Sequence, residues 1–244
     1  MWGCRVNQDE ADVTRSVETG RPACFHADAV RPTVVGIVST ILAAQTVGFV
    51  LHLMGTPLAL KVALFYTIVF GGLVRTVLGA SARWGSGSLR ADFGWWARRS
   101  DLLRAVPVML LAGMAGALAT SWWHGARSSN ADWLGSADTA SVVVFSAFAV
   151  IAAPLFEELV FRGLLQRALT SRYGTRPAIL IQGVAFGLYH FNLTGGAANL
   201  PTMVYLAAVG CVLGIAAHRW QRLGPTILAH ALTNIFVTVA LIAR

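Results

Sequence analysis

The chain has 244 residues, of which 56% are hydrophobic and only 12% are charged. Soluble domains carry roughly 25% charged residues, so this chain has too little polar surface for a water-soluble globule. The composition therefore excludes an ordinary cytosolic enzyme, a disordered chain and a small disulfide scaffold, and it indicates a polytopic membrane protein. The formal net charge of +8 fits basic residues gathered in cytoplasmic loops, so we expect the lipid bilayer as a partner and no nucleic acid.

The first segment, residues 1–32, is polar and mixes acidic with basic residues. No apolar stretch follows a basic start there, so a cleavable signal peptide is not expected. We interpret this segment as a cytoplasmic tail.

Hydrophobic segments long enough to cross a bilayer follow, since a spanning helix needs about 20 mostly apolar residues. The fold class predicted is all-α, a transmembrane helix bundle of about seven spans. The segments are 33–54, 57–79, 103–123, 139–161, 177–194, 198–217 and 224–243. Residues 81–101 are too charged to span, and their tryptophans and arginines favour a place in the headgroup region.

The basic residues predict the orientation of these spans. With the N-terminus in the cytoplasm, 16 of the 19 Lys and Arg residues fall in the tail, the second, fourth and sixth loops or the span ends beside them. This asymmetry predicts a cytoplasmic N-terminus. We divide the chain into the tail, N-terminal helices with an interfacial loop over residues 33–138, and a core of the last four spans over residues 139–244.

The fourth span contains two adjacent carboxylates, Glu157 and Glu158. Ionisable groups inside an apolar span are unfavourable by about 3 kcal/mol each, and they usually face a cavity and have partners. Glu158 and Arg162 are four residues apart and so lie on one helix face as an ion pair. Glu157 lies about 100° around the helix and has no local counter-ion. A buried carboxylate of that kind is a candidate general base.

Two later spans contribute further polar side chains. The fifth contains His190, and the seventh contains His230 and Asn234 four residues apart on one face. Counting residues from the predicted turns places Glu157, His190 and Asn234 at comparable depths. Each residue alone is explained as a structural hydrogen bonder between helices, but together they predict a site.

Other catalytic signatures are missing. The chain has no His-Glu-x-x-His motif, and Gly85-Ser86-Gly87-Ser88 lies in a charged loop that we interpret as a linker. A zincin-type site and a serine hydrolase are therefore disfavoured. A Walker A loop and a dinucleotide fingerprint are missing too, so nucleotide use is not indicated.

Three motifs in successive order resemble those of the CPBP family of intramembrane proteases, the CaaX protease and bacteriocin-processing group also called Abi. They are Glu157-Glu158-x-x-x-Arg162, Phe186-x-x-x-His190 and His230-x-x-x-Asn234. Each motif alone is weak, but their order in successive spans is specific. The resemblance covers residues 139–243, and the segment before it matches only in being hydrophobic.

This resemblance implies a helical bundle around a cavity and an endopeptidase acting on a membrane protein or peptide. By motif, Glu157 would activate water, His190 would hold it, and His230 with Asn234 would stabilise the oxyanion. Glu158 and Arg162 would support the site, and Phe186 belongs to the second motif. The need for a cofactor stays open, because Glu157, His190 and His230 could instead be ligands of Zn²⁺.

Two other classes of function stay open from the sequence. A proton-coupled transporter could use Glu157 and His190 as a relay, although the first three spans offer few polar groups to line a path. A catalytically silent scaffold or immunity protein could use the motif residues to bind a partner. The predominance of arginine over lysine favours a bacterial inner membrane, and the sequence does not determine the oligomeric state.

Overall fold

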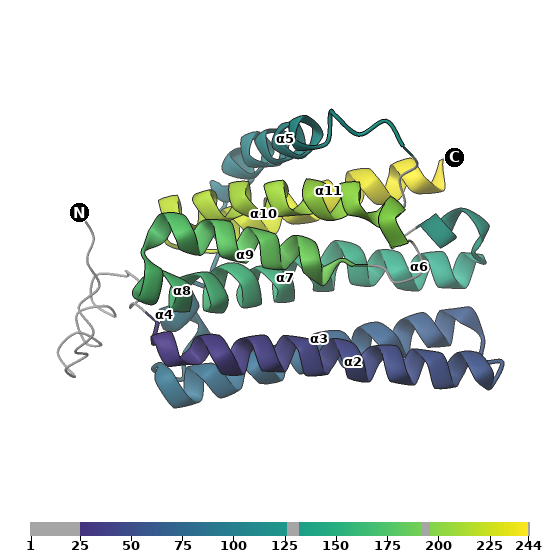
Figure 1. Ribbon diagram of the computed structural model, residues 1–244, viewed down its shortest axis with the longest axis horizontal. Coiled ribbons are helices and arrows are strands. Elements are labelled where there is room, and N and C mark those ends of the chain that lie inside the picture. Colours follow the sequence, from purple (N-terminus) through teal and green to yellow (C-terminus); the bar gives the residue numbers. More distant parts are fainter. Residues whose placement is uncertain (1–24, 126–131, 192–195, 244) are drawn as a thin grey trace.

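The computed structural model describes residues 25–125, 132–191 and 196–243, and every regular element in these ranges is helical (Figure 1). Residues 1–24 of the predicted tail therefore lie outside the described residues. The α-helices are α2 (Val30–Leu53), α3 (Leu58–Trp84), α4 (Leu89–Phe93), α5 (Asp101–Ala119), α6 (Thr139–Ala147), α7 (Ala153–Glu158), α8 (Gln166–Tyr173), α9 (Thr175–Tyr189), α10 (Leu200–Trp220) and α11 (Gly224–Ile242). Short 3₁₀ turns are η1 (Ala27–Ala29), η2 (Asp132–Ser136) and η5 (Gly196–Asn199).

Five helical stretches are long and apolar enough to cross a membrane. They are Ala27–Leu53, Leu58–Trp84, Asp101–Ala119, Thr139–Tyr173 and Gly196–Trp220. A sixth apolar stretch, Gly224–Ala240, is shorter, and α9 has 15 residues. Each of the predicted hydrophobic segments thus forms a helix, and the prediction of an all-α membrane bundle is confirmed.

The helices lie side by side, with the motif-bearing helices in the middle of the bundle (Figure 1). The antiparallel pair α2 and α3 covers one side and contacts α6. Helix α5 covers the opposite side and packs on α10 and α11. The catalytic motifs predicted from the sequence are therefore enclosed by apolar helices on both sides.

The stretch Thr139–Tyr173 is one continuous helix with two wider π-helical turns, η3 (Phe148–Ala152) and η4 (Leu159–Leu165). Pro154 lies at the start of α7, directly after the first of them. Because proline has no N–H to donate, it disturbs the regular hydrogen-bond ladder of a helix. Turns of this kind are frequent at functional sites, and here they flank the two adjacent glutamates.

Helices α9 and α10 approach closely along a row of glycines. A Cβ atom on Gly210 would lie 2.9 Å from the Cα atom of Gly183, and one on Gly183 would lie 3.0 Å from the Ala207 carbonyl oxygen. Larger residues would hold the two helices apart, as expected for small-residue seams in membrane bundles. This seam positions the end of α9, where the second motif lies.

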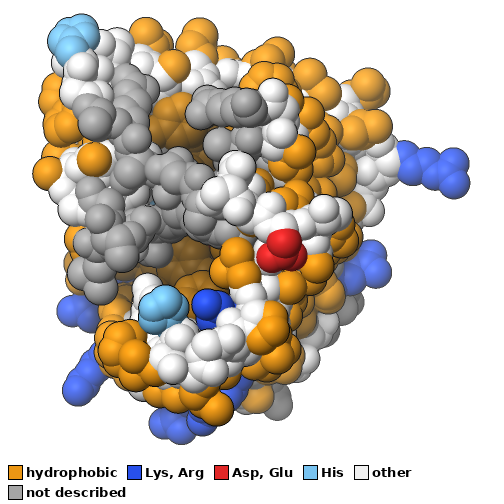
Figure 2. Space-filling model, turned by 90° about the vertical axis from the view of Figure 1, so that its right-hand side faces the viewer, with side chains coloured by type: hydrophobic (Ala, Val, Ile, Leu, Met, Phe, Trp, Pro, Cys, Tyr) orange, Lys and Arg blue, Asp and Glu red, His pale blue; other side chains and the backbone are white. Residues whose placement is uncertain are grey.

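The outer surface is apolar, as a bilayer requires. Leu42, Leu103 and Phe236 are 62%, 81% and 74% exposed, on three different helices. Figure 2 shows the end of the molecule away from the N-terminus, where hydrophobic side chains gather around the rim. Together with the five apolar stretches, this surface identifies an integral membrane protein.

Candidate active site

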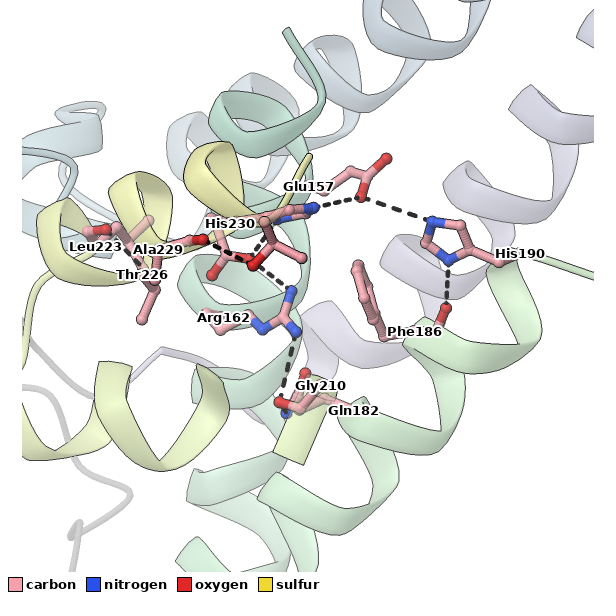
Figure 3. A network of polar contacts seen from close by, with 12 residues as sticks. Glu157, Arg162, Gln182, Phe186, His190, Gly210, Leu223, Thr226, Ala229 and His230 are labelled. Carbon is pink, nitrogen blue, oxygen red and sulfur yellow. Dashed lines mark hydrogen bonds and ion pairs between the residues drawn. The ribbon is translucent and has the colours of Figure 1, made fainter. Parts of the chain in front are cut away.

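Three predicted site residues from three helices meet in the interior. Glu157 belongs to α7, His190 immediately follows α9, and His230 belongs to α11. The Oε2 atom of Glu157 lies 4.0 Å from Nε2 of His190 and 3.9 Å from Nε2 of His230 (Figure 3). The side chains of Glu157 and His230 are buried, and that of His190 is partly exposed. The structure therefore brings these three residues together, as the motif spacing predicts.

The second glutamate, Glu158, is paired with Arg162 of the same long helix and with His230 of α11. Its Oε1 atom accepts hydrogen bonds from Nη1 of Arg162 at 2.8 Å and from Nδ1 of His230 at 3.0 Å. Glu158 is fully buried and Arg162 is 1% exposed. The i, i+4 ion pair expected from the sequence is present, and Glu158 also links the first motif to the third.

Both imidazoles are held in one orientation by the partner of Nδ1. In His190, Nδ1 lies 2.8 Å from the carbonyl oxygen of Phe186. A carbonyl oxygen can only accept, so Nδ1 carries the proton and Nε2 presents a lone pair toward Glu157. In His230 the acceptor is the Glu158 carboxylate, which has the same effect.

The ring of Phe186 lies between these groups as a common wall. The guanidinium carbon of Arg162 is 4.3 Å from the ring centroid, a cation–π distance. The imidazoles of His190 and His230 lie edge-on to the same ring at 4.8 and 5.8 Å between centroids. Phe186 is 1% exposed, so this buried ring fixes the relative positions of three polar side chains (Figure 3).

Glu157 differs from Glu158 in what its carboxylate faces: its Oε2 atom is turned toward the Nε2 atoms of His190 and His230. Its buried Oε2 atom has no hydrogen-bond partner among the described residues. Gaps of 3.9 and 4.0 Å to two imidazole nitrogens are too long for direct hydrogen bonds. They are gaps that a bridging water molecule can fill, because each half of the bridge is a separate hydrogen bond.

Asn234, one turn beyond His230 on α11, makes a different contact. Its Nδ2 atom donates to the carbonyl oxygen of Ala149 at 2.7 Å. The N–H of Ala153 bonds the carbonyl of Phe148 in the π-helical turn, and the next residue, Pro154, has no N–H to offer Ala149. The proline thus leaves an acceptor that Asn234 fills, while the second amide hydrogen of Asn234 is not used in this bond.

Sequence reasoning did not identify Gln182 of α9, which is fully buried beneath Arg162. Its Nε2 atom donates to the carbonyl of Gly210 at 2.9 Å, and Nη2 of Arg162 reaches the same oxygen at 3.4 Å. The only signal in the sequence was a single amide in an apolar run. Tyr66 of α3 was not identified either; its ring stacks on that of Phe148, in the helix that carries Glu157, at 5.5 Å between centroids.

The donors of the site fit a metal in their chemistry. Two imidazole Nε2 atoms with Nδ1 tied to an acceptor, together with a carboxylate, form a set typical of catalytic zinc. Ligands about 2.0–2.1 Å from a tetrahedral zinc ion would lie roughly 3.4 Å apart, whereas the donors here are 3.9 and 4.0 Å apart. Within the described residues, no group of three or more His, Cys, Asp or Glu side chains is at metal-binding spacing.

Comparison with known protein families gives a match on the motif-bearing part of the chain. Residues 139–236 match the family described as type II CAAX prenyl endopeptidase Rce1-like. This confirms the family resemblance that the three ordered motifs indicate. No curated protein and no solved structure matches the chain at a significant level.

Proposed function

We propose that this membrane protein, whose residues 139–236 match the Rce1-like family, hydrolyses a peptide bond in a membrane-held protein or peptide. In this proposal residues 139–244 are the catalytic core and residues 33–138 are helices that accompany it. Glu157 is the general base, and His190, His230 and Asn234 assist it.

One observation carries the proposal: the buried Oε2 atom of Glu157, without a hydrogen-bond partner among the described residues, faces two imidazole nitrogens at 3.9 and 4.0 Å. A water molecule at this place can donate one hydrogen bond to Glu157 and the other to Nε2 of His190. Both bonds aim the oxygen lone pairs of the water away from the acceptors and toward the place of a substrate carbonyl.

The proton then follows a simple route. As the water oxygen attacks the carbonyl carbon, Glu157 takes a proton from the water and later gives it to the leaving amine. General base catalysis of this kind contributes about 10²–10⁴-fold in rate. Glu158 is the weaker candidate for this role, because its Oε1 atom accepts hydrogen bonds from Arg162 and His230, whereas Glu157 is the carboxylate that faces the two Nε2 atoms.

The oxyanion needs hydrogen-bond donors. Since Nδ1 of His230 already donates to Glu158, His230 can carry a second proton on Nε2 and donate it to the developing negative charge. Asn234 has one amide hydrogen beyond its bond to Ala149. If the site holds a metal, Glu157, His190 and His230 would be its ligands, and the metal would supply charge for the same oxyanion.

The orientation follows the same proposal. The turns after α3, α8 and α10 lie at the end of the bundle where the described chain begins (Figure 1). These turns, the helix ends beside them and the N-terminal part together contain most of the arginines. By the positive-inside rule this end faces the cytoplasm. We place the protein in the inner membrane of a bacterium with its N-terminus inside.

The test is cleavage of a membrane-peptide library by the purified full chain in lipid nanodiscs. Wild type, Glu157→Gln and the matched control Asp138→Asn are each assayed with and without a strong chelator. Asp138 is an exposed carboxylate at the start of the same continuous helix, where it caps α6. We expect Glu157→Gln to lose cleavage and Asp138→Asn to keep it, with no effect of the chelator.

Each other outcome has a definite meaning. Cleavage lost with chelator and restored by Zn²⁺ would make His190 and His230 metal ligands and replace the metal-free mechanism. Cleavage retained by Glu157→Gln would refute the base. No cleavage by wild type of any library member would contradict the protease and favour a silent partner-binding role.

A further inference from the structure

A second group of charged side chains lies around the segment between α4 and α5. The segment 94–100 joins these helices and is fixed to the turn between α10 and α11. The N–H of Leu223 donates to the carbonyl of Gly94 at 2.9 Å, and Nη1 of Arg222 donates to the buried carboxylate of Asp101. Because these bonds connect parts of the chain more than 100 residues apart, the segment is a fixed platform.

Guanidinium groups surround the ring of Trp96 on this platform. Their central carbons lie at 4.7 Å for Arg98, 4.9 Å for Arg222 and 5.8 Å for Arg90 from the ring centroid. These are cation–π distances. The indole therefore gathers three positive charges that would otherwise repel one another.

The charges of this group do not balance. Asp101 accepts from Arg222, from Nη1 of Arg104 at 3.3 Å and from the backbone N–H of Arg98 at 2.8 Å. The guanidinium groups of Arg90 and Arg98 are exposed and have no carboxylate within 4 Å among the described residues. Two arginines thus remain available to an anion.

Apolar side chains flank these arginines. Trp95 and Leu102 are 38% and 54% exposed, and the platform lies between the candidate spans that end at Trp84 and begin at Asp101. Exposed leucine and tryptophan beside arginine are typical of a segment at the boundary of headgroups and acyl chains. An anion that meets this platform therefore comes from the membrane surface.

We propose that this platform, residues 94–100, together with Arg90 of α4, is a binding site for the phosphate of an anionic phospholipid. Arg90 and Arg98 donate to the phosphate oxygens, because a planar guanidinium matches phosphate with paired hydrogen bonds. The surplus positive charge favours an anionic lipid over a zwitterionic one. The acyl chains lie along the exposed side chains of α5.

The test measures lipid retained by the full chain. Wild type and the variant Arg90→Gln/Arg98→Gln are exchanged from detergent into mixtures of phosphatidylglycerol and phosphatidylcholine, and native mass spectrometry counts each bound lipid. The matched control is Arg172→Gln/Arg176→Gln, which removes the same charge from the last turn of α8 and the first turn of α9. We expect the platform variant to lose about 30-fold in phosphatidylglycerol affinity, with phosphatidylcholine unchanged.

The control variants and competitors distinguish a specific lipid site from general attraction between the protein surface and anionic lipid. An equal loss in the control variant, or full retention by Arg90→Lys/Arg98→Lys, would show general surface charge and overturn the proposal. Competition by millimolar inorganic phosphate or glycerol 3-phosphate would show a site for a free phosphate compound and overturn the lipid assignment. Loss confined to the platform variants and insensitive to these competitors would establish it.

Discussion

The carboxylates of Asp101 and Glu157 are both buried, but they differ in their hydrogen-bond partners. Asp101 is fully buried and pairs with Arg222 and Arg104, and its oxygens accept hydrogen bonds from three donors. Glu157 is also buried, but its Oε2 atom has no such partner among the described residues. Nearby, Glu158 takes up Arg162 and His230. The comparison teaches that a buried charge alone indicates structure, whereas a buried charge left unsatisfied beside oriented donors and acceptors indicates chemistry.

The largest effect that we expect is on turnover, and it distinguishes Glu157 from Asp101. Glu157→Gln should lower turnover about 10⁴-fold and leave the thermal midpoint unchanged or higher, because it removes a buried charge without breaking a hydrogen bond. Asp101→Asn should lower the midpoint, because it weakens three hydrogen bonds, and should leave turnover of the folded enzyme within about twofold. Peptide cleavage and thermal unfolding in the same detergent measure both. A drop in midpoint for Glu157→Gln would mean that its carboxylate has a structural partner.

The next effect compares the two arginines. Arg162→Met should destabilise the fold by about 3–5 kcal/mol, because it leaves Glu158 buried without its counter-ion. Arg222→Met should lower the free energy of unfolding by less, about 2 kcal/mol. Arg104 and the backbone N–H of Arg98 still donate hydrogen bonds to Asp101 in this variant. Reversible unfolding in mixed micelles gives both free energies. Equal losses would contradict the greater dependence of Glu158 on a single cation.

The smallest of the three effects concerns Asn234. Asn234→Ala should lower kcat about 100-fold with KM unchanged, the loss expected for one oxyanion donor. Thr233→Ala is the matched control, because within the described part of the chain the Thr233 hydroxyl bonds only the Ala229 carbonyl of its own helix, at 2.9 Å. A lower thermal midpoint with unchanged kcat for Asn234→Ala would assign the amide to support of Ala149 alone.

Local patterns predicted much of this molecule. Hydropathy located every long helix because the bilayer requires about 20 apolar residues for each span. The i, i+4 spacing predicted the Glu158–Arg162 pair, since it needs only one helix. The ends were less predictable: the fourth hydrophobic segment continues to Tyr173 in the structure, and α9 ends at Tyr189. Hydropathy reports the apolar part of a helix and not where its hydrogen bonds stop.

The sequence by itself determined a helical membrane protein with three motifs, and with them the residues to examine. Only the tertiary structure decided how these residues are used. It directs Glu158 to His230, turns Oε2 of Glu157 toward two imidazoles, and gives Asn234 the carbonyl that Pro154 cannot bond. These contacts depend on the rotation of α7, α9 and α11 about their axes and on two π-helical turns. Residue spacing fixes which side chains share a face of one helix, but the packing between helices fixes which atoms meet.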